Sequence, residues 1–241
     1  MNVYWLEQTE ADVPAENDWL SASEQARLDV LRFPKRRADW RLGRWTAKRA
    51  LAAYQGFPSD PHVLARIEVR PALSGAPEAF FANRPAPITI SLSHRAGIAM
   101  CAVARAGVRL GCDLEAVEPR SDAFVADYFT GEEQELVARV SSADRSRILA
   151  LLWSAKESAL KALHEGLRLD TRCVVVNRYG GSYDLNGWSR LHVLYTGQHG
   201  FHGWWRHGNG MLRTLVADPT PDPPLRLQAP VYSLDHMASC A

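Results

Sequence analysis

The sequence predicts an α+β protein made of two similar halves, each a helix packed on a small antiparallel sheet. Trp45-Thr-Ala-Lys48 recurs as Trp153-Ser-Ala-Lys156, and an Ala-Leu pair closely follows each copy. Each copy lies in a helical pattern that precedes several strand patterns. This four-residue repeat, Trp45–Lys48 and Trp153–Lys156, is called the echo below. Such a repeat also arises by chance, but the repeated order of helix and strands favours two related units, 1–106 and 107–241. We expect an active site in the cleft between them, where ligand pockets often form.

Composition excludes several classes of protein. The chain has 241 residues, 46% hydrophobic and 23% charged, with a formal net charge of +1. Such a chain can bury a proper core, so disorder, collagen and coiled coil are excluded. The near-neutral charge speaks against nucleic acid or an anionic membrane as a partner. Because two halves lie in one chain, we expect a monomer.

The cysteines and the amino terminus indicate a cytoplasmic protein. Four cysteines without a Cys-x-x-Cys pair suggest neither a zinc site nor a disulfide framework, and free thiols suit a reducing compartment. The first residues lack a signal peptide. The best apolar run, Ile98 to Ala104, is far shorter than the roughly 20 residues of a membrane helix.

The first half begins with helices. Ser21-Ala-Ser-Glu24 predicts a capping box at a helix start. Apolar positions from Asp39 to Tyr54 fit an amphipathic helix, which Phe57-Pro-Ser-Asp-Pro61 ends. A short strand over 65–69 and a Gly- and Pro-rich loop over 71–87 follow.

The strand patterns are clearest in the middle of the chain. Alternating residues predict strands over 88–94, 97–104 and 108–115, and the short turns between them predict an antiparallel meander. Helices are expected from Thr130 and over 146–164. Strands are expected over 173–176, 191–195 and 211–217, and a Pro-rich, irregular tail after Asp218.

Gly111-Cys-Asp-Leu-Glu115 is the first candidate site. Residues two apart on a strand share a face, so Asp113 and Glu115 present paired carboxylates. Their repulsion would raise a pKa unless a cation intervenes, and Mg²⁺ is the usual oxygen-liganded ion. A solvated strand end remains the alternative.

Trp153-Ser-Ala-Lys-Glu-Ser-Ala-Leu-Lys161 is the second candidate. Helical spacing predicts that Trp153, Lys156, Glu157 and Lys161 lie on one stripe. Glu157 could give a metal oxygen or act as a base, and Lys161 could meet a phosphate oxygen. The alternative is an exposed face with an ordinary Glu-to-Lys pair, although a tryptophan is costly to leave among solvated charges.

Candidate phosphate ligands lie upstream. Ser93 and His94 end the first strand of the meander, although a lone histidine is more often structural. Arg84 precedes Pro85 in the loop before them, and arginine suits bidentate phosphate contacts. A dense set of basic residues follows residue 31: Arg32, Lys35, Arg36, Arg37, Arg41, Arg44, Lys48 and Arg49.

Together these motifs resemble the Sfp-type 4′-phosphopantetheinyl transferases. The signatures are Gly-x-Asp-x-Glu at 111–115 and Trp-x-x-Lys-Glu-x-x-x-Lys at 153–161, with Ser-Leu-Ser-His94 upstream. The ordered resemblance runs from about Leu31 to Leu169. It implies a pseudo-twofold pair of α+β halves with the active site between them, which agrees with the echo.

The resemblance also implies the reaction and its residues. The 4′-phosphopantetheine arm of coenzyme A would pass to a serine hydroxyl of an apo acyl or peptidyl carrier protein, releasing adenosine 3′,5′-bisphosphate. Glu157, or a water on the metal, would take the serine proton, and Lys161 would stabilise the developing charge. Asp113, Glu115 and Glu157 would hold Mg²⁺ or Mn²⁺. Coenzyme A would contact Arg44, Arg84, Ser93, His94, Lys156 and Lys161.

Three departures from the family pattern stand out. The loop often written Gly-Lys/Arg-Pro reads Asn83-Arg-Pro85 here. His94 is followed by Arg95 where a small hydroxyl residue is common, and His164 replaces a usual glycine. None of the three touches the predicted metal carboxylates.

Two other functions use the same residues. The basic stretch from Arg32 to Arg49 could serve a non-catalytic module that binds nucleic acid or a carrier protein. The carboxylates could instead serve a Mg²⁺-dependent phosphodiester hydrolase, which would break coenzyme A without a protein acceptor. The sequence leaves the carrier, among fatty acid, polyketide, peptide and siderophore pathways, undetermined.

Overall fold

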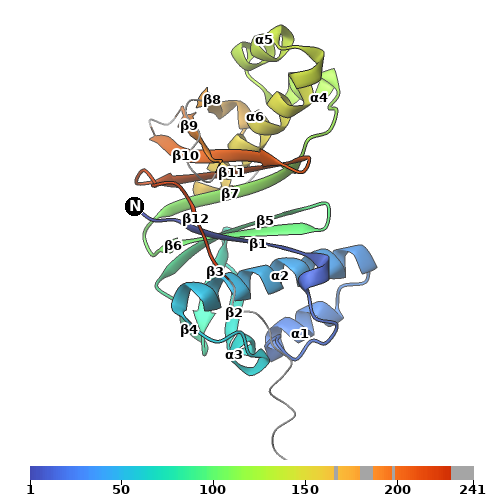
Figure 1. Ribbon diagram of the computed structural model, residues 1–241, viewed down its shortest axis with the longest axis vertical. Coiled ribbons are helices and arrows are strands. Elements are labelled where there is room, and N and C mark those ends of the chain that lie inside the picture. Colours follow the sequence, from blue (N-terminus) through green and yellow to red (C-terminus); the bar gives the residue numbers. More distant parts are fainter. Residues whose placement is uncertain (166–167, 180–186, 197–198, 229–241) are drawn as a thin grey trace, which may run out of the picture.

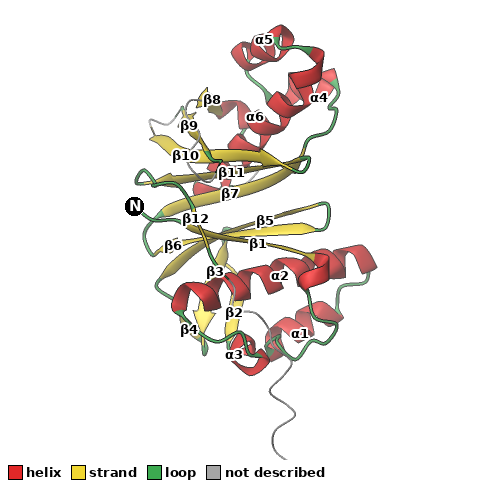
Figure 2. Ribbon diagram, in the orientation of Figure 1, coloured by secondary structure: helices red, strands yellow, loops and turns green. Residues whose placement is uncertain are grey.

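The computed structural model describes residues 1–165, 168–179, 187–196 and 199–228. Two β-sheets pack face to face, and a long helix covers the outer face of each (Figure 1, Figure 2). The prediction of an α+β chain with small antiparallel sheets is confirmed. None of the described helices combines the length and the apolar character that crossing a membrane requires.

The sheets have the following members. The first has the order β12-β1-β6-β5, the second β7-β11-β10-β9-β8 and a small third β2-β3-β4. The strands are β1 (Tyr4–Thr9), β2 (Ile67–Pro71), β3 (Pro77–Phe81), β4 (Arg84–Pro85), β5 (Ile88–Arg95), β6 (Ile98–Arg105), β7 (Arg109–Ala116), β8 (Val174–Tyr179), β9 (Ser189–Tyr195), β10 (His199–Gly208), β11 (Met211–Asp218) and β12 (Leu225–Arg226). The helices are α1 (Ala22–Asp29), α2 (Pro34–Gln55), α3 (Pro61–Ala65), α4 (Asp122–Tyr128), α5 (Gly131–Arg139) and α6 (Ser142–Ala162).

Strand β6 shows how the layers are built. Successive side chains of a strand point to opposite faces. Cys101 and Val103 therefore join the core beneath α2, while Met100, Ala102 and Ala104 pack against the second sheet. A strand buried on both faces reads as a continuous apolar run, which explains the composition of this segment.

The order of elements repeats along the chain. In the first half β1 precedes α1 and α2, and β6 then pairs antiparallel with both β1 and β5. In the second half β7 precedes α5 and α6, and β11 pairs antiparallel with both β7 and β10. The division into units at residues 106 and 107 stays a prediction, and the turn there joins β6 to β7.

The two lysines of the echo occupy equivalent buried positions. Lys48 lies 2.5 Å from Glu24, and Lys156 lies 2.9 Å from Glu133. Each of these glutamates closes a capping box at the start of a preceding helix, α1 or α5. Each also accepts the backbone N–H of a strand residue, Val69 at 3.2 Å and Val176 at 3.1 Å. The echo therefore marks one structural device used twice, which locks two helices to a strand.

The predicted three-strand meander is wrong. β5 and β6 form a hairpin, but β7 pairs with β11 in the second sheet, where Asp113 lies opposite Thr214. The turn after β6 carries the chain from one sheet to the other, because β7 buries residues on both of its faces. One face meets α6 and the other meets the β5–β6 hairpin.

The described part of the tail, residues 219–228, is more ordered than expected, and the rest of the predicted irregular tail lies outside the described residues. Leu225 and Arg226 form β12, which pairs parallel with Tyr4 and Trp5 of β1. Asp222 forms an ion pair with the amino terminus at 2.9 Å. These contacts cover an edge of the first sheet that would otherwise present unpaired backbone groups.

Candidate active site

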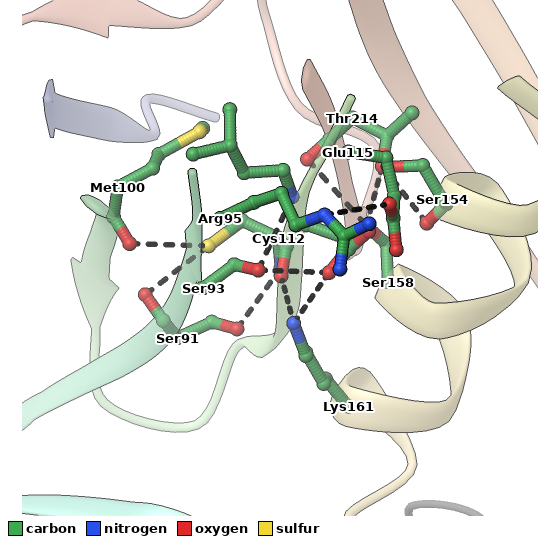
Figure 3. Close-up of polar contacts among 12 residues, drawn as sticks. Ser91, Ser93, Arg95, Met100, Cys112, Glu115, Ser154, Ser158, Lys161 and Thr214 are labelled. Atoms are coloured by element: carbon green, nitrogen blue, oxygen red, sulfur yellow. Dashed lines mark hydrogen bonds and ion pairs between the residues drawn. The ribbon is translucent and has the colours of Figure 1, made fainter. Parts of the chain in front are cut away.

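Charged side chains of β7 and α6 meet where these elements touch. Gly111 permits the contact, since a Cβ built there would lie 1.8 Å from the carbonyl oxygen of Ser158. The hydroxyls of Ser154 and Ser158 lie 2.8 and 2.7 Å from Thr214 Oγ1 and fix α6 to β11 (Figure 3). This close packing brings the acidic end of β7 beside the second half of α6.

Asp113 is buried and held on one side only. Its Oδ1 accepts a hydrogen bond from Ser93 Oγ at 2.8 Å and pairs with Lys161 Nζ at 2.7 Å. Ser93 in turn accepts the backbone N–H of Leu114 at 3.2 Å, so β5 and β7 are joined through this serine. The other oxygen of Asp113, Oδ2, is buried with no hydrogen-bond partner.

Glu115 has partners on both oxygens. The indole N–H of Trp153 donates to Oε1 at 3.1 Å, and the guanidinium of Arg120 donates to Oε2 at 3.1 Å. Arg95 Nε approaches Oε2 to 3.8 Å (Figure 3). The expectation that this departure from the family pattern does not touch the carboxylates is therefore wrong. Burial, followed by the charge of Asp113, raises the pKa of the Glu115 carboxyl, while the two arginines and Trp153 act in the opposite direction.

Burial and the charge of Asp113 shift the pKa values of both Glu157 and Lys161. Burial raises the pKa of Glu157, and the negative charge of Asp113 adds to the effect. Burial by itself would lower the pKa of Lys161, but the charge of Asp113 and its hydrogen bond raise it above its ordinary value. The Oε1 atom of Glu157 is buried with no hydrogen-bond partner.

These residues fit a divalent cation in part. Within the described ranges, no group of three or more His, Cys, Asp or Glu side chains is arranged to hold a metal ion. Two buried carboxylate oxygens without partners are nevertheless costly, since buried polar atoms are normally satisfied. A hard cation with oxygen ligands would satisfy both of them.

Helix α6 does not present the stripe that the sequence suggested. Trp153, Glu157 and Lys161 are half-buried beside β7, but Lys156 is fully buried on another side of the helix. Its ammonium pairs with Glu133 and donates to the carbonyl oxygens of Thr171 and Val174. The prediction that Lys156 shares the face of Glu157 is wrong, because the lysine–glutamate lock described above requires it in the core.

The predicted phosphate ligands are dispersed. His94 lies at the exposed end of β5; partial desolvation lowers its pKa, and the nearby charges are Asp39, Lys161, Lys35 and Asp113. Arg44 is largely buried on α2, 3.8 Å from Glu24. Arg84 is exposed on β4, in the third sheet. Only Ser93 and His94 of this set lie beside the carboxylates, and the contacts of all four with coenzyme A stay predictions.

A cavity beside Lys161 contains residues that the sequence analysis missed. It has a volume of about 270 Å³ and lies between the Ser74–Pro77 turn, β5, Leu110 of β7 and the end of α6. Gly75-Ala76-Pro77 is itself a Gly-x-Pro sequence, and this local signal could have identified the turn. A larger cavity of about 420 Å³ lies between Asn177, Trp204 and Pro221 and contains none of the predicted site residues.

Comparison with known proteins adds one match. A family model described as the 4′-phosphopantetheinyl transferase superfamily matches residues 109–203. The matched segment includes Asp113, Glu115, Glu157 and Lys161 and begins at β7. A search of curated proteins found no significant match. The family match supports a phosphopantetheinyl transferase activity in general.

Proposed function

We propose that this chain is an Sfp-type 4′-phosphopantetheinyl transferase that modifies a serine hydroxyl of an apo acyl or peptidyl carrier protein. One observation carries the proposal: Asp113 and Glu157 each keep a buried oxygen without a partner, beside the ammonium of Lys161. Such a site suits a polyanion and a cation together. The family match over 109–203 supports the same class of reaction.

Coenzyme A would bind between the units 1–106 and 107–241. The cavity beside Lys161 has walls from β5 and from α6, so it draws on both units. Lys161 uses two of its three N–H donors on Asp113 and on the carbonyl oxygen of Cys112, at 2.7 and 3.0 Å. The third donor would meet a pyrophosphate oxygen, and His94 would meet the 3′-phosphate at the end of β5.

The two unpartnered carboxylate oxygens would hold a divalent cation, with Glu115 beside them. When bound, Mg²⁺ or Mn²⁺ would neutralise charge on the pyrophosphate and so lower the barrier to displacement. Lys161 would act on the same charge from the protein side. Because Asp113 holds it by an ion pair, the lysine needs no reorganisation when the reaction begins.

Transfer would proceed by displacement at phosphorus. The serine oxygen of the carrier would attack the β-phosphorus of coenzyme A, and the bond to the bridging pyrophosphate oxygen would break. Adenosine 3′,5′-bisphosphate would leave with that oxygen. Glu157, or a water on the metal, would accept the serine proton. Most of the rate enhancement would come from positioning the serine against coenzyme A and from neutralising charge on the pyrophosphate.

The decisive experiment is a transfer assay with a panel of carriers. The full chain is incubated with coenzyme A, MgCl₂ and apo carriers from fatty acid, polyketide, peptide and siderophore assembly lines. Intact-protein mass spectra should show the gain of one phosphopantetheine arm, and a carrier with its serine changed to alanine should show none. Breakdown of coenzyme A without a modified carrier would indicate a hydrolase and overturn the proposal.

A further inference from the structure

The three carboxylates of the site, Asp113, Glu115 and Glu157, differ in whether they keep an oxygen without a hydrogen-bond partner. Asp113 uses Oδ1 for Ser93 and Lys161 and keeps Oδ2 buried and unpartnered. Glu157 likewise keeps Oε1 buried and unpartnered. Both oxygens of Glu115, in contrast, accept hydrogen bonds from protein donors. A site that used all three carboxylates alike would not need this asymmetry.

We infer that a divalent cation takes its protein ligands from Asp113 and Glu157 alone, and that Glu115 is a positioning residue. This inference rests on the proposed function, in which the cation and coenzyme A share the site. It departs from the family resemblance, which implies three carboxylate ligands. Glu115 acts instead by holding Trp153 and Arg120 next to the two ligands.

The neighbouring charged groups distinguish the two metal ligands from the positioning residue Glu115. Arg120 and Arg95 approach Glu115 Oε2 to 3.1 and 3.8 Å, so its negative charge is already matched inside the protein. A cation drawn to Glu115 would have to lie close to two guanidinium groups, and like charges at such distances repel. Asp113 is also paired, with Lys161 at 2.7 Å, but that contact uses Oδ1 and leaves Oδ2 without a donor. Glu157 Oε1 likewise has no donor. These two are the oxygens for which an ion removes a desolvation cost.

The contacts of Trp153 explain why Glu115 is needed at all. The indole ring packs against Phe124 and Tyr128 of α4, with centroids 5.1 Å away in both cases. Arg120 lies over the ring of Phe124 at 4.8 Å. Glu115 therefore joins β7 to α6 through Trp153 and to the start of α4 through Arg120. Glu157 follows Trp153 by one helical turn, so fixing the indole also fixes the face of α6 that carries Glu157.

Binding of Mn²⁺ alone tests the ligand assignment. Electron paramagnetic resonance of free Mn²⁺ gives its dissociation constant for the unaltered chain, Asp113→Asn, Glu115→Gln and Glu157→Gln. We expect Asp113→Asn and Glu157→Gln to weaken binding by about tenfold or more, and Glu115→Gln to change it by less than about threefold. Glu118→Gln is the matched control, since Glu118 contacts the same two arginines but is exposed. Loss of binding in Glu115→Gln comparable to that in the other two would overturn the inference.

Kinetics test the positioning role. Trp153→Phe keeps the ring and removes the N–H that Glu115 accepts. We expect Glu115→Gln and Trp153→Phe each to lower kcat by about tenfold with the Mg²⁺ concentration for half-maximal rate unchanged. The double variant should be no slower than the slower single variant, because both changes weaken the same contact between Glu115 and Trp153. Multiplying effects, or a raised Mg²⁺ requirement, would overturn the positioning role.

The two tests also separate this inference from the proposed function. Mn²⁺ titration requires neither coenzyme A nor a carrier, so the ligand assignment is decided even if no carrier is modified. Absence of transfer by the unaltered chain would overturn the proposed function alone. If Glu115→Gln does not fold, Trp153→Phe carries both measurements, with binding of Mn²⁺ expected to stay within about threefold.

Discussion

Ser93 Oγ lies 2.8 Å from Asp113 Oδ1, and this hydrogen bond joins β5 of the first sheet to β7 of the second. The contact fixes which oxygen of Asp113 is left unpartnered. A serine that the sequence offered as a phosphate ligand thus also orients a carboxylate. The acidic site is therefore held by both halves of the chain, although its acidic residues all come from the second.

The close approach at Gly111 predicts a large loss of stability. Alanine at this position would place its Cβ 1.8 Å from the carbonyl oxygen of Ser158, which is backbone and cannot turn away. We expect Gly111→Ala to lower the free energy of unfolding by about 3 kcal/mol, measured by urea titration.

Gly43 offers a matched control within α2. A Cβ built at Gly43 meets nothing within 4 Å. Alanine there should stabilise the chain by about 0.5–1 kcal/mol, since glycine is a poor helix former. Equal stability of Gly111→Ala and the unaltered chain would contradict the packing of α6 on β7.

The buried position of Lys156 predicts a role in stability. Lys156→Met would leave Glu133 buried and unpaired, which costs about 3–5 kcal/mol of unfolding free energy. Changing both residues, as Glu133→Gln with Lys156→Met, should recover much of this loss. A normal unfolding curve with a raised KM for coenzyme A would instead restore the phosphate contact that the sequence suggested.

Stability of the metal-free chain should depend on pH through Glu157. Its pKa in the folded chain lies above the ordinary value, because burial and Asp113 disfavour the charged form. The folded state then binds more protons than the unfolded state, so this group lowers stability at neutral pH and the penalty fades as pH falls through the raised pKa.

The comparison of variants isolates this effect. In the presence of EDTA, Glu157→Gln should be more stable than the unaltered chain at pH 7. The difference should shrink as the pH approaches the ordinary pKa of glutamate, as urea titrations at several pH values would show. A difference in unfolding free energy that stays constant across this range would mean that the surroundings of Glu157 do not raise its pKa.

Recognition of the 3′-phosphate should depend on His94. We expect His94→Ala to raise the KM for coenzyme A by about tenfold, the effect of losing a hydrogen bond to a charged group, with kcat little changed. Dephospho-coenzyme A, which lacks the 3′-phosphate, is the matched control ligand. Its KM should be the same for the variant and the unaltered chain, and a parallel rise for both ligands would exclude the phosphate contact.

The sequence by itself determined the local features of this protein. The capping box at Ser21, the helix start at Thr130 and the helix around Trp45 follow from short-range patterns, and the structure contains them. The order of the carboxylate and lysine motifs resembles that of the 4′-phosphopantetheinyl transferases, whose superfamily model matches residues 109–203, and the echo predicted a repeated unit. These signals depend on neighbours within one helical turn or one strand, so a single sequence contains them.

Tertiary structure decided which residues of each motif face the site. Lys156 and Lys161 carry the same charge on one helix, yet one pairs with Glu133 in the core and the other with Asp113 beside the carboxylates. Periodicity gives the angle between two side chains but not the element that each will meet. Long-range packing places β7 in the second sheet and brings Arg120 and Trp153 to Glu115. It also places the Gly75-Ala76-Pro77 turn and Lys161 around one cavity. Such contacts are fixed only when distant segments compete to bury the same surface.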